Sequence, residues 1–193
     1  MAHGQFSGEP ETVWLTEDGA QDRLMRLVRP FSFFDGAGNT WRAPAGAVVN
    51  GASIPRALWT VVGSPYTGDY RRASILHDVA CEAAGHDWNR RRAADRMFFR
   101  ACRAGGCSIL QSIVLYIGVR IDAVAPGVAA WQAAVDTDSV GPRVRRTDAE
   151  VRLDEDFQAI ADRVLAAGDT DDAAEVERRT DEALFAVAAV PMR

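Results

Sequence analysis

The stretch from Asn50 to Arg103 constrains this chain most, because two helical patterns there carry ionisable residues on their apolar faces. From Asp69 to Ala84, apolar residues recur at the three- and four-residue spacing of a helix with one buried face. His77 lies on that face and Asp78 lies at its edge. Gly85 is expected to end this helix, since glycine is favoured just past a helix C-terminus.

A second helix is predicted from Arg90 to Arg103, with Asn89 as its N-cap. Its apolar face carries Asp95, and a buried carboxylate is costly unless a partner pairs with it. If the helices fold back against each other about the turn near His86, His77 and Asp95 lie at the same level. An aspartate that holds one imidazole nitrogen leaves the other nitrogen free to take a proton from water. The pair is therefore a candidate general base and orienting group.

Other interpretations of the same residues stay open. A histidine on an apolar helix face is more often a satisfied core residue, which here would only lock the two helices together. Arg92 and the two arginines before it occupy a helix N-terminus, where the helix dipole prefers acids. They either pair locally, for example with Asp87, or face an anionic ligand. His86 and Asp87 can also join the site in a metal-dependent hydrolase.

Composition narrows the class of protein. A chain of 193 residues with 48% hydrophobic content has room for one domain with a real core plus an appendage. Its net charge of −5 argues against nucleic-acid binding through bulk charge. Three cysteines are expected as free buried thiols, and no His/Cys cluster has the spacing of a zinc motif. No signal peptide is recognised, so synthesis as a cytoplasmic chain is expected.

The fold class expected is α+β, with a small N-terminal antiparallel β-sheet, a mainly α-helical core and a helical hairpin at the C-terminus. Residues 1–11 are expected as a flexible tail, 12–135 as the core domain, 136–146 as a linker and 147–193 as the C-terminal α-hairpin. The predicted strands are Thr12–Leu15, Arg23–Phe34 with Pro30 at an edge or bulge, Thr40–Ala43 and Ala47–Asn50.

The helices that follow carry no obvious chemistry. A third helix is predicted from Ser108 to Ala125 as a buried core helix, because Arg120 and Asp122 interrupt its apolar run before it can span a membrane. In the C-terminal hairpin, one helix starts at a capping box at Thr147 and the next at Thr170. This acidic hairpin is expected to pack on the core or to bind a protein partner.

Three motifs, in this order and spacing, resemble a family of uncharacterised bacterial and phage proteins known as a domain of unknown function. They are Asn50-Gly51-Ala52-Ser53-Ile54-Pro55, His77-Asp78 and Ala94-Asp95-Arg96-Met97-Phe98, and the likeness covers about Arg26 to Asp122. The resemblance implies a phage or prophage origin and no settled activity. The chain departs from the family pattern at Asn50, where Asp is usual.

The same stretch more distantly resembles prokaryotic phospholipase A2, in which a Gly/Ser loop precedes a His-Asp helix. In that group an Asp followed three positions later by Phe lies on the second helix. The resemblance implies that His77 activates water and Asp95 orients it, and that calcium polarises the ester. The implied calcium ligands are Asp78 together with Asn50, Gly51 and Ser53 of the loop. Both families favour an aromatic residue where Cys81 stands here.

Two functions from different classes follow. The first is a phage-related hydrolase whose dyad acts on a phospholipid or related ester, with calcium and a lipid surface as partners. The second is a non-enzymatic component of a phage or gene-transfer particle, virion-associated or released. In that case the polar cluster only locks the helix pair, and the C-terminal helices bind an assembly partner.

Overall fold

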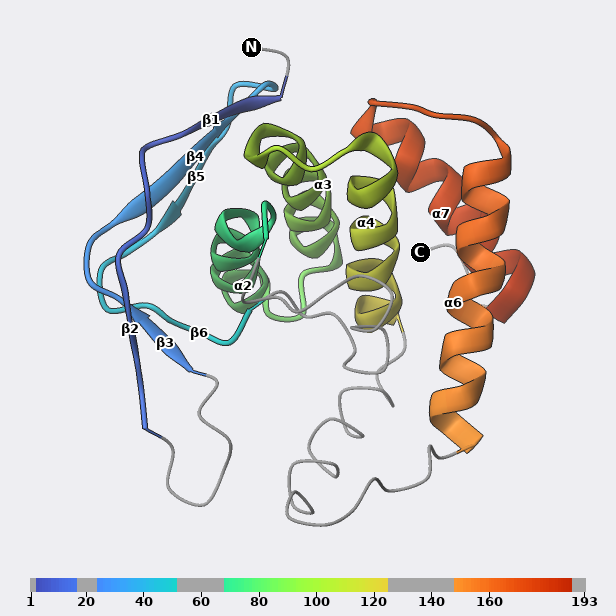
Figure 1. Cartoon of the computed structure of the whole chain (residues 1–193), viewed down its shortest axis with the longest axis horizontal. Coiled ribbons are helices and arrows are strands. Elements are labelled where there is room, and N and C mark those ends of the chain that lie inside the picture. Colours follow the sequence, from blue (N-terminus) through green and yellow to red (C-terminus); the bar gives the residue numbers. More distant parts are fainter. Residues whose placement is uncertain (1–2, 17–23, 52–67, 125–147, 189–193) are drawn as a thin grey trace. The chain divides into compact units, whose positions relative to one another are not determined.

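The structure is a computed structural model that describes residues 3–16, 24–51, 68–124 and 148–188 (Figure 1). Its elements in chain order are β1 (Gly4–Phe6), β2 (Thr12–Trp14), β3 (Met25–Leu27), β4 (Phe31–Asp35), β5 (Thr40–Ala43), β6 (Val48–Val49), α2 (Arg71–Ala84), α3 (Trp88–Gly105), α4 (Ile109–Val124), α6 (Asp148–Ala166) and α7 (Ala173–Ala188). Antiparallel strands followed by helices confirm the predicted α+β class and the helical C-terminus.

The chain forms two compact units. The first contains the six strands with α2 and α3, and the second contains α4, α6 and α7. The predicted linker, 136–146, lies outside the described residues, as does the predicted end of the core domain at residue 135. Those domain boundaries therefore stay a prediction.

The N-terminal strands form two three-stranded antiparallel sheets, with orders β1-β4-β5 and β2-β3-β6, where one sheet was expected. The strand predicted across Arg23–Phe34 is two strands, β3 and β4, separated at Pro30, which has no N–H to donate to a ladder. The expectation of a loose tail over residues 1–11 is wrong for Gly4–Phe6, because this segment pairs with β4. That pairing joins residues about thirty positions apart, so no local sequence pattern predicts it.

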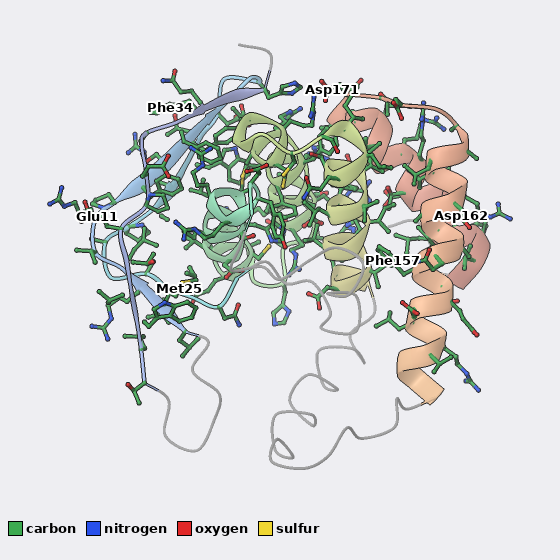
Figure 2. The ribbon with its side chains drawn as sticks, in the orientation of Figure 1. Glu11, Met25, Phe34, Phe157, Asp162 and Asp171 are labelled. Carbon is green, nitrogen blue, oxygen red and sulfur yellow. The ribbon has the colours of Figure 1, made fainter. Side chains whose placement is uncertain are left out.

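Each sheet has one face turned toward the core. Buried and more exposed residues alternate along β3 and β4, as expected of half-buried strands. Met25 on β3 is 5% exposed, whereas Phe34 on β4 is 50% exposed, and both are labelled in Figure 2. Phe6 of β1 stacks on Phe31 at a centroid distance of 5.6 Å. Helices α2 and α3 cover this inner face through contacts with β5 and β1.

Helices α2 and α3 lie side by side and form the largest helix–helix contact of the first unit (Figure 1). Gly85 ends α2 as predicted, with a φ of 52°, and its N–H donates to carbonyls of the last turn. The N-cap of α3 is Asp87, not Asn89, which lies inside the helix. Asp87 has an extended backbone, and its side chain accepts the N–H three residues later at 3.1 Å. The turn is therefore shorter than predicted.

The second unit is a set of three helices in which α4 contacts both α6 and α7. Arg120, which interrupts the apolar run of α4, is buried and donates to Asp181 of α7 at 2.6 Å. Helix α7 begins at Ala173 and not at Thr170. Thr147, the predicted start of the preceding helix, lies outside the described residues. Over the part of the chain that the structure describes, no helix is long and apolar enough to cross a membrane.

Candidate functional site

His77 of α2 and Asp95 of α3 meet in the interior of the first unit. His77 Nε2 lies 2.8 Å from Asp95 Oδ1, and neither side chain has exposed surface. The contact predicted from their equal distances to the turn is therefore present. With Nε2 as the donor to the carboxylate, the remaining ring nitrogen, Nδ1, is the one that can exchange a proton with another group.

A thiol and an aromatic ring surround the imidazole. Cys81 Sγ lies 3.4 Å from His77 Nε2 and 3.7 Å from Nδ1. The Phe98 ring lies 4.9 Å from the imidazole, centroid to centroid. Cys81 was not predicted as a site residue, although its position four residues after His77 on one helix was the available signal. In this conformation the Cys81 sulfur is a neighbour of Nδ1.

The charge state of His77 follows from these neighbours. Burial alone favours the neutral imidazole and lowers its pKa, but the Cys81 sulfur and the Asp95 carboxylate outweigh burial. Together they raise the pKa of His77 to about 10. The dyad is therefore a buried ion pair at neutral pH, with a protonated imidazole beside a carboxylate.

Asp78 lies at the edge of the site, where α2 meets the end of β6. Its Oδ2 accepts the backbone N–H of Asn50 at 3.0 Å, so the predicted approach of the loop to Asp78 is present. Its Oδ1 is buried and has no hydrogen-bond partner among the residues that the structure describes. Burial raises the pKa of Asp78 to about 7, against the opposing effects of His77 and the nearby N–H groups. Asp78 therefore titrates close to neutral pH.

The fit of calcium to this edge depends on open oxygen ligands, because Ca²⁺ takes six to eight of them. In the amide orientation that satisfies its neighbours, the Asn50 side chain donates to both Asp78 Oδ2 and the Gly51 carbonyl, at 3.3 and 3.1 Å. Both oxygens are thus occupied by donors, and Ser53 lies outside the described residues. Asp78 Oδ1 alone is an open anionic ligand in the described part of this edge, which fits calcium poorly.

The other predicted site residues lie away from the dyad or beside it. His86 and Asp87 are exposed at the α2–α3 turn, and α2 runs seven residues past His77, roughly 10 Å along its axis, before reaching them. Asp87 caps α3 and pairs with Arg90. Arg92 is partly exposed, whereas Arg91, the arginine before it, has its Nε 3.8 Å from Asp95 Oδ1. The three cysteines are free and buried, as predicted.

Comparison with known proteins places this site in a recognised segment. Residues 25–119 match the model of the family described as protein of unknown function, DUF1353. The uncharacterized protein y4jT of Sinorhizobium fredii (strain NBRC 101917 / NGR234) is 34% identical over 119 residues, which are 60% of this chain and 33% of that protein. The uncharacterized protein y4iH of the same strain is 30% identical over 93 residues, 48% of this chain and 38% of that protein.

The chain spans about a third of the length of these relatives. No solved structure matches it. The family match covers α2 and α3 and hence the whole His77–Asp95 site. The expected resemblance to an uncharacterised family is confirmed over residues 25–119, which are similar to the DUF1353 family of proteins of unknown function.

Proposed function

We propose that this DUF1353-like domain is a hydrolase in which the His77–Asp95 dyad activates water, with a phospholipid or related ester as the substrate class. The observation that carries this proposal is the 2.8 Å contact between His77 Nε2 and Asp95 Oδ1. It leaves Nδ1 as the nitrogen that takes the proton from water, while Asp95 orients the ring and stabilises the imidazolium that forms. The likeness to the phospholipase A2 arrangement suggests the ester substrate.

Two properties of the site set requirements for this chemistry. The imidazole has no exposed surface, so turnover needs a conformation in which water and the ester reach Nδ1. A pKa of about 10 keeps the ring protonated at neutral pH, and a protonated ring cannot act as a base. Activity that depends on this base should therefore increase with pH up to about 10. We derive no step through calcium, because the described residues fit it poorly.

A non-enzymatic role is the second candidate, and the complete burial of the ion pair favours it. In that role the protein is a component of a phage or gene-transfer particle, and His77 and Asp95 serve only to hold α2 against α3. The α6–α7 hairpin would bind the assembly partner. Its Phe185 is 56% exposed, which gives such a partner an apolar contact.

Ester hydrolysis by the full chain separates the two candidates. Phospholipid in mixed micelles and a soluble ester are assayed from pH 6 to 10, with calcium or with a chelator. The variants are His77→Gln and Asp95→Asn, with His86→Gln as the matched control at an exposed histidine. The hydrolase predicts activity that rises with pH, falls at least a hundredfold in folded His77→Gln and is unchanged in His86→Gln.

Absence of hydrolysis in the wild type at every pH, together with loss of folding in both dyad variants, would establish the structural role. Circular dichroism of each variant reports whether it folds. Activity that persists in the presence of the chelator would remove calcium from the mechanism.

A further inference from the structure

We propose that His77, Cys81 and Asp95 form a binding site for one zinc ion. This site differs from the expected calcium site at Asp78, and it does not depend on the proposed hydrolase function. One ligand atom from each of the three residues lies within 4.8 Å of the other two. All three side chains are buried.

The distances suit a single ion. Zinc binds imidazole nitrogen and carboxylate oxygen at about 2.0–2.2 Å and thiolate at about 2.3 Å, so tetrahedral ligand atoms lie roughly 3.4–3.6 Å apart. His77 Nε2 lies 3.4 Å from Cys81 Sγ, which already meets this value. Nε2 and Asp95 Oδ1 lie 2.8 Å apart and must separate by about half an ångström as the ion replaces the shared proton. Rotation of the two side chains supplies such a change.

The helices hold the three ligands in place before any metal arrives. His77 and Cys81 are four residues apart on the buried face of α2, the spacing that places two side chains on one face of a helix. Asp95 reaches them from α3, which packs along α2. The ligands are therefore pre-organised, so little conformational entropy is lost on binding.

Charge balance supports zinc binding at this site. Zinc is bound by neutral imidazole, thiolate and carboxylate. Coordination by His77, Cys81 and Asp95 therefore places two negative ligands around a doubly charged ion. The occupied site has a net charge of zero, so no uncompensated charge is buried.

The donor set also selects the metal. Thiolate and imidazole are ligands for zinc, whereas calcium and magnesium take oxygen. Three protein ligands leave a fourth tetrahedral position, which in zinc sites of this kind is taken by water. Arg91, with its Nε 3.8 Å from Asp95 Oδ1, places a positive charge beside that carboxylate.

Metal binding by the full chain tests the site directly. The chelator-stripped protein is titrated with Co²⁺ as a spectroscopic probe, and zinc content is measured by mass spectrometry after reconstitution. We expect one ion per chain and a thiolate-to-cobalt charge-transfer band. Cys81→Ala should lose that band and bind at least tenfold more weakly. The matched control is Cys102→Ala. Cys102 is a buried cysteine of α3 and is not one of the three proposed ligands, so this variant should retain the band and the affinity.

The thermal midpoint supplies a second readout. Zinc should raise the Tm of the wild type and of Cys102→Ala but not that of Cys81→Ala, which keeps the His77–Asp95 pair and can fold. A wild type that binds less than a tenth of an equivalent, or a cobalt band that survives in Cys81→Ala, overturns the zinc site. Neither result depends on hydrolysis, so the zinc site and the hydrolase can fail separately.

Discussion

Replacing Asp95 by asparagine should make the free energy of unfolding of the first unit depend much less on pH. The substitution keeps the shape of the side chain but removes the charge that His77 Nε2 faces at 2.8 Å. The pKa of His77 is about 10 in the folded protein and 6.5 in an unfolded chain. At 1.36 kcal/mol per pH unit, this difference corresponds to about 5 kcal/mol of stabilisation at most.

The sign follows from the raised pKa. The folded state holds the proton more tightly, so the stabilisation is fully present below pH 6.5 and is lost as pH rises toward 10. Cys81 also raises the pKa of His77, so Asp95→Asn removes only part of the effect. We expect a loss of roughly 3 kcal/mol at pH 6, which agrees with the cost of breaking a buried ion pair, and a much smaller loss at pH 10.

Urea unfolding followed by circular dichroism between pH 6 and 10 measures this difference. Taking the difference between wild type and variant cancels the titration of groups far from residue 95, which both proteins share. Glu82→Gln, an exposed acid on α2, is the matched control and should change the unfolding free energy by less than about 0.5 kcal/mol. A loss below about 1 kcal/mol at pH 6, or one equally large at pH 6 and pH 10, would refute the buried ion pair.

Three further substitutions test other parts of the structure. Asp78→Asn should leave the Tm nearly unchanged at pH 4 and raise it at pH 8, because the raised pKa of Asp78 makes its ionisation costly in the folded state. Equal changes in Tm at both pH values would contradict this. Arg120→Ala should cost roughly 3–5 kcal/mol in urea unfolding by removing the buried ion pair with Asp181, and adding Asp181→Ala should recover part of the loss. Asp87→Ala should cost about 1 kcal/mol in the same assay, whereas Asn89→Ala should change little if Asp87 is the cap.

The contact between His77 and Asp95 was predictable because the sequence signals for it act over short stretches of the chain. Helical periodicity places His77 and Asp95 on the apolar faces of two helices, and a short turn between helices makes them antiparallel. The equal spacing of both residues from that turn then sets them at one level. Gly85 marks the end of α2 because a positive φ there suits glycine. Each of these steps depends on residues close together in the chain.

The cap of α3 shows where local signals become ambiguous. Asp87 and Asn89 are both favoured N-cap residues, two positions apart. The choice depends on which residue has an extended backbone, and in the structure that residue is Asp87. Cys81 was missed as a site residue although it lies four residues after His77 on α2. One cysteine at that spacing matches no zinc motif, because the remaining partner, Asp95, comes from α3.

The sequence by itself determined the α+β class, the helical stretches and the pairing of one imidazole with one carboxylate, since periodicity, caps and turn lengths act over a few residues. Tertiary structure alone decided that β1 pairs with β4, that Arg120 is buried against Asp181, and that His77 is sealed beside a thiol. These features depend on which distant surfaces pack together. That packing brings Cys81 and Asp95 to His77, where they raise its pKa against the effect of burial, and it buries Asp78, which raises the pKa of that carboxyl.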